Sequence, residues 1–210
     1  MPESDDTEIR TDLPALVTLG DPRLARPCAP VPVADIGTEA FFERLETLAE
    51  AMRHYLGIGI AAPQVGWWER FFLTTVTVHP PGEDEPRLQL QPWINPEIRS
   101  FSDELNWAWE GCLSVPGLRG WVRRPAAIAV QGYNQHGERV SREFAGWDAR
   151  VFQHEYDHLD GWLFPYRLSD PRHLVTLEEL ENREDWPEDW PAPGARDAPI
   201  GEVVPDGGES

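Results

Sequence analysis

The sequence contains no lysine, only two cysteines and no long apolar run. All 18 basic residues are arginine, and the 37 acidic residues give the 210-residue chain a formal net charge of −19. Because phosphate binding depends on clustered cationic side chains, this charge argues against nucleic acid as a direct ligand. No segment approaches the roughly 18 apolar residues of a membrane helix, so no membrane contact is expected.

The two cysteines, Cys28 and Cys112, lie far apart and do not form the pattern of a disulfide framework. The sequence assigns no role to Cys28. The first residues are polar and acidic, without the basic and apolar regions of a secretory signal. We therefore expect a cytoplasmic protein.

The acidic residues are concentrated toward the C-terminus. Residues 178–210 hold eleven acidic residues and two arginines, with proline and glycine through the last twenty. This composition predicts a disordered, solvated tail, with docking through Trp186 and Trp190 as the alternative. Residues 1–12 are expected to form an acidic extension, and residues 13–177 to form one folded domain.

The hydrophobic pattern predicts an α+β domain. Residues 38–56 show apolar positions at three- and four-residue steps, with Thr38 as N-cap and Gly57 as the stop. A second helix is expected over about 146–159, ending at Gly161. Strands are expected over the β-rich runs Phe71–Val78, Leu88–Ile94, Trp121–Arg123, Ala127–Tyr133 and Arg139–Phe144. The expected fold has antiparallel strands packed around the late helix, with an early amphipathic helix.

The late helix carries a possible metal-binding pattern. His154 and His158 are four residues apart and therefore share one helix face, where they could hold one metal ion. Glu155 between them is placed to act as general base and acid. The alternative is a surface helix that contains two histidines by chance. Against it, the histidines continue a stripe with Trp147 and Val151, which predicts a buried face.

Two further segments contain chemically useful residues. Cys112, in Glu110-Gly111-Cys112-Leu113-Ser114, is a suitable third ligand that leaves a fourth metal position open, although by itself this segment favours a small buried cysteine. The stretch from Gly57 to Gly66 contains three glycines and two alanines, which allow close approach of a ligand. Its Gln64 amide could donate to a developing oxyanion. A simple Gly-rich connector is the alternative.

Together and in this order, the three segments resemble the motifs of the peptide deformylases. That family is marked by G-Φ-G-Φ-A-A-x-Q, E-G-C-L-S and an H-E-x-D-H helix preceded by Gln, which stand here as GIGIAAPQVG, EGCLSVPG and QHEYDHLDG. The resemblance covers roughly residues 14–168. It implies a metal-dependent hydrolase that removes the formyl group from the N-terminal formyl-methionine of nascent polypeptides and releases formate.

The resemblance also implies a role for each matching residue. Cys112, His154 and His158 would bind one divalent metal ion, Fe²⁺ as the native choice, with Zn²⁺, Ni²⁺ or Co²⁺ as alternatives. Glu155 would handle protons, while Gln64 and the backbone N–H of Leu113 would receive the oxyanion. Substrate-binding residues would be Gly57, Ile58, Gly59, Glu110, Arg119, Trp147, Arg150 and Val151, with Ile58 and Gly59 pairing with the substrate main chain.

This chain departs from the family pattern at Arg150 and in its C-terminal tail. Arg150 replaces an aliphatic residue of many relatives, so the pocket is expected to differ in shape, and Glu110 is expected to pair with Arg124. The partners would be formyl-methionyl nascent peptides, with transient ribosome proximity left open. Some bacterial relatives have a basic C-terminal helix for ribosome docking, whereas this tail is acidic.

Two other functions compete with this interpretation. In a zinc protease of the H-E-x-x-H type, Glu178 or Glu179 would be the third ligand, about twenty residues beyond His158. A metal-stabilised module that only binds formylated or methionine-starting peptides is the second alternative. Such a module is expected to lack Glu155 or Gln64, and both are present.

Overall fold

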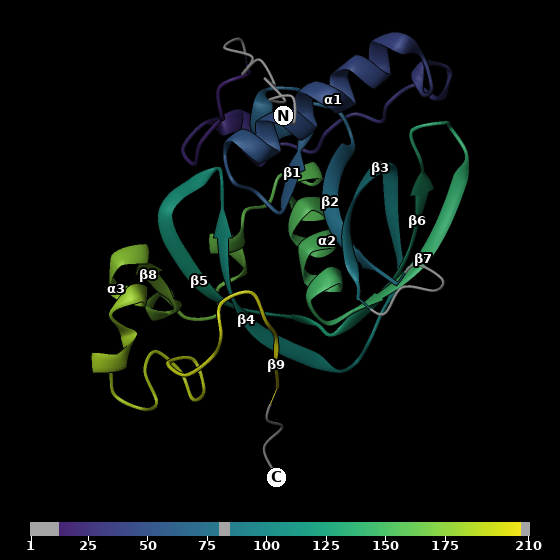
Figure 1. The fold of residues 1–210 in the computed structure, drawn as a ribbon. Coiled ribbons are helices and arrows are strands. Elements are labelled where there is room, and N and C mark those ends of the chain that lie inside the picture. The colour runs from purple at the N-terminus through teal and green to yellow at the C-terminus, as the bar shows by residue number, and fades with distance from the viewer. Residues whose placement is uncertain (1–12, 80–84, 207–210) are drawn as a thin grey trace, which may run out of the picture.

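The computed structural model describes residues 13–79 and 85–206, and the expected extension 1–12 lies outside these ranges. Two antiparallel sheets flank a central helix, α2, as Figure 1 shows. The helices are α1 (Glu39–His54), α2 (Gly146–Leu159) and α3 (Leu177–Glu181). The α+β prediction is therefore confirmed.

The larger sheet has five strands in the order β1-β2-β3-β6-β7. They are β1 (Gly59–Ala61), β2 (Phe71–Val78), β3 (Arg87–Phe101), β6 (Ala127–Tyr133) and β7 (Arg139–Ala145). The smaller sheet has the order β8-β5-β4-β9. Its strands are β4 (Leu105–Cys112), β5 (Val115–Pro125), β8 (Leu174–Thr176) and β9 (Val204–Pro205). The strands predicted over 71–78, 127–133 and 139–144 match β2, β6 and β7, whereas β1, β4, β8 and β9 were not predicted.

Helix α1 forms where its sequence pattern predicts it. The Thr38 hydroxyl accepts a hydrogen bond from the Phe41 N–H at 3.3 Å, so Thr38 is the expected N-cap. The apolar side of α1, including Leu48, is buried against the larger sheet, and the Phe41 ring contacts the Phe71 ring of β2 edge-on. The chain then turns at Leu56, which has a φ of 58°, and enters the Gly-rich segment before β1.

Helix α2 faces the larger sheet with one side and the smaller sheet with the other. Its apolar side packs on the larger sheet, where the Phe152 ring lies 5.0 Å from the Phe72 ring and 5.1 Å from the Trp93 ring. These edge-to-face contacts fix the rotation of the helix about its axis. The opposite side, which carries Arg150 and His154, therefore points toward the smaller sheet.

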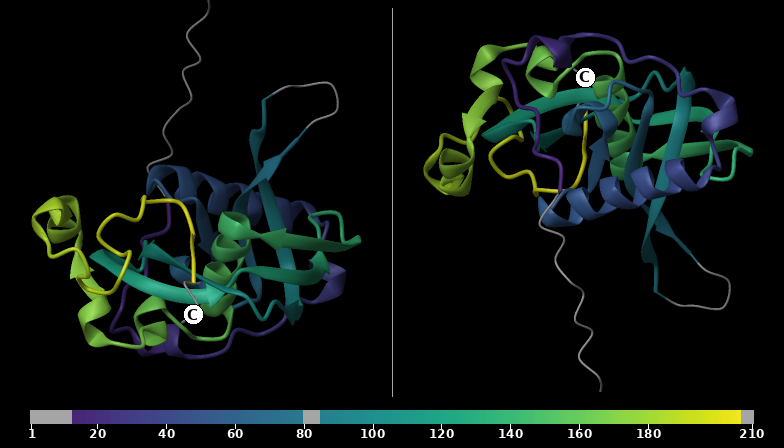
Figure 2. Two further views of the ribbon diagram at one scale, coloured as in Figure 1. Left: turned by 90° about the horizontal axis from the view of Figure 1, so that it is seen from below. Right: turned by 90° about the horizontal axis from the view of Figure 1, so that it is seen from above.

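The prediction of a disordered tail over residues 178–210 is wrong for residues 178–206. Leu180 of α3 is fully buried, and the Trp186 ring lies 6.1 Å from the Trp109 ring of β4. Strand β9 pairs with β4, and Figure 2 shows the yellow C-terminal segment following that sheet. The tryptophans of β4 and β5 offer an apolar surface that outweighs the acidic composition of this segment. Residues 207–210 lie outside the described ranges.

Candidate active site

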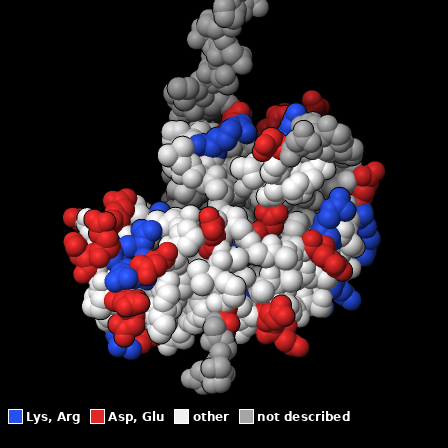
Figure 3. All heavy atoms as spheres, turned by 60° about the horizontal axis from the view of Figure 1, so that its bottom comes forward, with Lys and Arg blue, Asp and Glu red and all other residues white. Residues whose placement is uncertain are grey.

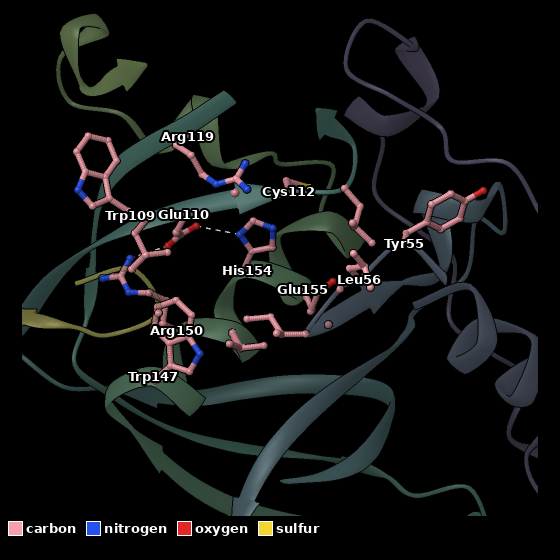
Figure 4. Close-up of a pocket in the computed structure, with 18 of the residues that line it drawn as sticks. Tyr55, Leu56, Trp109, Glu110, Cys112, Arg119, Trp147, Arg150, His154 and Glu155 are labelled. Carbon is pink, nitrogen blue, oxygen red and sulfur yellow. Dashed lines mark hydrogen bonds and ion pairs between the residues drawn. The ribbon is translucent and has the colours of Figure 1, made fainter. Parts of the chain in front are cut away.

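A cavity of about 510 Å³ lies between the segment before β1, the end of β4 and one side of α2. Figure 4 shows the side chains that line it. The lining includes these predicted site residues: Gly57, Ile58, Gly59, Gln64, Glu110, Cys112, Leu113, Arg119, Trp147, Arg150, Val151, His154 and Glu155. Of the predicted set, only the ligand His158 is not part of this lining, and it lies behind Cys112 on the buried side of α2.

Three side chains converge where the cavity meets α2. Cys112 ends β4, and His154 and His158 lie one turn apart on α2. Their ligand atoms all lie within 4.8 Å of one another, and Cys112 Sγ is 3.3 Å from His158 Nε2. This set of one thiolate and two imidazoles fits a divalent transition-metal ion and leaves a fourth position open.

Glu110 fixes one of these ligands. Its Oε2 is 2.9 Å from His154 Nδ1, an interaction drawn as a dashed line in Figure 4. Because Nδ1 is occupied by the carboxylate, His154 presents Nε2 to the metal position. A carboxylate behind a ligand histidine sets its tautomer and ring orientation.

The charge of Cys112 supports the same interpretation. Burial raises the pKa of this thiol, but the charge and hydrogen bonds of His158 and His154 outweigh that effect and lower the pKa to about 5. The Ser114 N–H also points at Cys112 Sγ, at 3.4 Å. The pocket therefore favours the thiolate, which is the form that binds metal.

Glu155 lies beside the three ligands and is held close to β1. Its side chain is buried, and a Cβ added at Gly59 would collide with its carboxylate, so any side chain at position 59 would force Glu155 to move. Its Oε2 has no hydrogen-bond partner within the described part of the chain. Burial raises the pKa of Glu155 to about 7, although His154 and His158 partly oppose this rise. A carboxyl group in this state can accept and return a proton near neutral pH.

Gln64 is oriented by its own backbone segment. It lies in a short 3₁₀ turn, Ala62–Val65, directly after β1, and its Oε1 accepts the Ala61 N–H at 2.8 Å. The amide NH₂ therefore points at Cys112 Sγ (3.5 Å) and Ser114 Oγ (3.3 Å). A donor with a fixed direction is thus available at the metal position.

Arg150 changes the pocket in a way that its position in the sequence did not reveal. It is 1% exposed and donates to Glu110 Oε1 at 2.6 Å and to the Asn106 backbone oxygen at 2.9 Å. Arg124 also pairs with Glu110, at 2.6 and 2.9 Å, so the predicted Glu110–Arg124 ion pair is present. The far part of the cavity therefore contains a fixed polar cluster instead of an aliphatic floor.

The cavity has six lining residues that were not among the predicted site residues: Tyr55, Leu56, Trp109, Gly111, Ile200 and Gly201. Trp109 precedes Glu110 in β4 and could have been found from its neighbour. Ile200 and Gly201 gave no signal, because they belong to the acidic segment that was expected to be disordered.

The third ligand of a protease-type site is not supplied by the glutamates that were considered. Glu178 and Glu179 are exposed on α3. Within the described ranges, the one group of metal-ligating side chains that meets at a single point contains Cys112 instead. The protease alternative is therefore wrong.

No described helix is long and apolar enough to cross a bilayer.

Two histidines and a cysteine with an open position, beside a buried glutamate, define a metal-dependent hydrolase site. The polypeptide deformylase family model matches residues 14–173. "Peptide deformylase 1" of Bordetella pertussis is 42% identical over 156 residues, which is 74% of this chain and 88% of that protein. A peptide deformylase of Thermotoga neapolitana is 40% identical and covers 77% of this chain and 90% of its own length.

Solved structures of peptide deformylases are also similar to this chain. A class I type b peptide deformylase of Acinetobacter baumannii with bound Met-Ala-Ser has a TM-score of 0.68 and 33% identity, covering 74% of this chain and 98% of that one. The Thermotoga maritima enzyme has a TM-score of 0.65 and 39% identity, covering 75% and 99%. The chain belongs to the polypeptide deformylase family. It is a metal-dependent hydrolase that removes the N-terminal formyl group of nascent peptides.

Proposed function

We propose that this chain deformylates formyl-methionyl peptides in the cytoplasm with one Fe²⁺ ion held by Cys112, His154 and His158. The observation that carries this assignment is the convergence of the three ligand atoms within 4.8 Å of one another. The catalytic domain would comprise residues 13–177. A metal in this position lowers the pKa of a bound water and polarises the substrate carbonyl.

Glu155 manages the protons of the reaction in this proposal. Its buried carboxylate accepts the proton of the attacking water and then delivers it to the amine nitrogen that leaves. The pKa of about 7 supports both directions of transfer, because neither protonation state is strongly favoured near neutral pH. The contact with Gly59 keeps the carboxylate from turning away from the site.

Two donors are assigned to the formyl oxygen. The Gln64 NH₂ is aimed at the metal position by the hydrogen bond that its Oε1 accepts from Ala61. The backbone N–H of Leu113, next to Cys112 in the cavity lining, would be the second donor. Preorganised donors of this kind stabilise the negative charge that develops during attack.

The substrate main chain is proposed to bind along β1. This strand is the edge of the larger sheet, and Ile58 and Gly59 line the cavity on that edge. An extended peptide could therefore add as a further strand. The methionine side chain would enter the part of the cavity lined by Trp147, Val151 and Arg150.

The ligand set and the surface charge support the proposed metal and setting. A Cys-His-His site suits iron(II) and also zinc, nickel or cobalt. Acidic side chains, with some arginines among them, gather over the α3 region, on the left of Figure 3. Because such a surface repels RNA, any transient proximity to the ribosome is proposed not to use this region.

The substrate assignment is tested on protein purified without oxygen and with its metal content measured. Amine release from formyl-Met-Ala-Ser is expected, with none from acetyl-Met-Ala-Ser, because the extra methyl group shields the carbonyl carbon and makes it less electrophilic. Equal release from both peptides would contradict the assignment. Binding of the formyl peptide without release, in protein that contains one metal ion per chain, would indicate the binding module instead.

The ligand assignment predicts that Cys112→Ser lowers the metal content by at least about tenfold, since disturbing even the residues that support a ligand costs about that much. The matched control is Cys28→Ser. Cys28 is buried, its thiol has a pKa raised to about 11 by burial, and it does not line the cavity. Elemental analysis after dialysis decides the matter, and retention of one metal ion in Cys112→Ser would remove this residue from the ligand set.

A further inference from the structure

We propose that residues 195–206, here called the C-terminal strap, form the far wall of the substrate side-chain pocket, where Ile200 limits the length of the first side chain. The proposal rests on the function given above and assigns its selectivity to a specific residue. Ile200 and Gly201 line the same cavity as the metal ligands. In Figure 4 the yellow ribbon of the strap enters this region beside Arg150 and Trp109.

The strap is anchored on both sides of Ile200. Before it, the Ala195 carbonyl oxygen accepts a hydrogen bond from Trp109 Nε1 at 2.8 Å, and Ala195 and Ala198 are buried. After it, Val204 pairs with Trp107 in the β9–β4 ladder. The five residues between Ala198 and Val204 are thus held at both ends, which fixes Ile200 beside the cavity.

A second set of contacts holds the end of the strap. Trp107 Nε1 donates to Asp206 Oδ1 at 2.9 Å, and Arg123 forms an ion pair with the same carboxylate. These contacts add directional bonds to the short ladder of β9. The strap is therefore held by specific contacts and forms a fixed part of the pocket wall.

The C-terminal end of the strap, residues 203–205, lies away from the metal position. Along β4, its partners Asn106 and Trp107 precede Cys112 by five to six residues, or roughly 17–20 Å of extended chain. On α2, a Cβ built at Gly146 would lie 3.8 Å from Val203 of the strap, and Gly146 precedes His154 by about 12 Å of helix. Two separate elements thus place residues 203–205 of the strap away from the metal position, and Ile200 and Gly201 connect this end of the strap to the cavity.

Ile200 is the part of this far wall whose side-chain size should set the length of the pocket. Arg150 is fixed by ion pairing to Glu110, and Trp109 is fixed by its bond to Ala195. Ile200, by contrast, is 53% exposed although it is a large apolar side chain. A half-exposed isoleucine at the edge of a cavity offers apolar surface to a ligand, so its size should decide how far a ligand extends.

This wall lies outside the part of the chain that matches the family. The family model ends at residue 173, and the Bordetella pertussis relative matches 74% of this chain but 88% of its own length. The strap therefore adds a boundary to the pocket that the matched region does not provide. Its selectivity should be a property of this chain.

The test compares two formyl peptides, formyl-Met-Ala-Ser and the same peptide with 2-aminooctanoate as first residue, whose unbranched side chain is longer. Ile200→Gly should raise kcat/KM for the longer peptide relative to methionine by roughly tenfold, and Ile200→Trp should lower the same ratio to a similar extent. Glu202→Ala is the matched control, because Glu202 is exposed on the strap and does not line the cavity. It should leave the ratio unchanged.

The outcomes distinguish the role of the strap from the proposed deformylase function. Wild-type turnover of formyl-Met-Ala-Ser with an unchanged ratio in both Ile200 variants would overturn the role of the strap and leave the proposed function intact. Absence of turnover in the metal-loaded wild type would overturn both. Thermal unfolding of each variant checks that the fold is preserved, and Ile200→Trp keeps every backbone contact of the strap.

Discussion

Replacing Glu155 with alanine is expected to leave the metal content unchanged and to lower kcat by about 10²–10⁴, the usual contribution of a general acid–base group. Glu155 is buried, has a free Oε2 among the described residues, and lies against Gly59 beside the ligands. It is not one of the three ligand side chains. Proton transfer and metal binding should therefore separate cleanly in this variant.

The measurement is single-turnover and steady-state deformylation alongside elemental analysis. Glu155→Gln serves as the isosteric partner, because it keeps the packing against Gly59 but cannot accept a proton. Both variants should lose activity alike, whereas Gln64→Ala, which removes one oxyanion donor, should cost about 10²–10³. Wild-type kcat in Glu155→Gln would assign the proton transfer to another group.

The parts of this fold that the sequence predicts are those with strong local patterns. Helices α1 and α2 follow from their apolar periodicity, and the cap at Thr38 follows from its position before that pattern. His154 and His158 were found for a related reason, because metal ligation at i and i+4 leaves a pattern in the sequence, whereas the roles of Cys112 and Gln64 came from the resemblance of their segments to family motifs. The structure then brings the distant Cys112 to the same point.

The missed elements depend on contacts between distant segments. Strand β4 is short in β-branched residues and is held by Trp109 packing on Trp121 and by pairing with β5. The strap is acidic and rich in proline, yet the surface that holds it comes from β4 and β5, about ninety residues earlier. No window of local sequence contains that information.

Arg150 is a single residue for which local sequence could not predict the contacts with a distant strand. Helical spacing places it on the face of α2 that carries the histidines, and the family resemblance implied that it lines the pocket. Spacing could not show that Glu110 and the Asn106 carbonyl would hold a fully buried cation there. A buried charge depends on its partners, which belong here to a different strand.

Replacing Glu110 with alanine is expected to lower the free energy of unfolding by about 3–5 kcal/mol, the cost of breaking a buried ion pair. Glu110 is 4% exposed and pairs with both Arg124 and Arg150. Without it, Arg124 keeps Asp157 at 2.7 Å, but Arg150 retains only neutral oxygen partners. The uncompensated charge in the variant is therefore Arg150.

Urea unfolding of metal-free protein measures this cost without a contribution from metal binding, and the Tm should fall by roughly 6–20 °C. The control is Glu97→Ala, which breaks an exposed pair with Arg99 and should cost less than about 1 kcal/mol. Adding Arg150→Met to Glu110→Ala should recover part of the loss, because the unpaired cation is then absent. A double variant less stable than Glu110→Ala would show that Arg150 stabilises the fold through packing and its neutral partners, and not as the charge that Glu110 compensates.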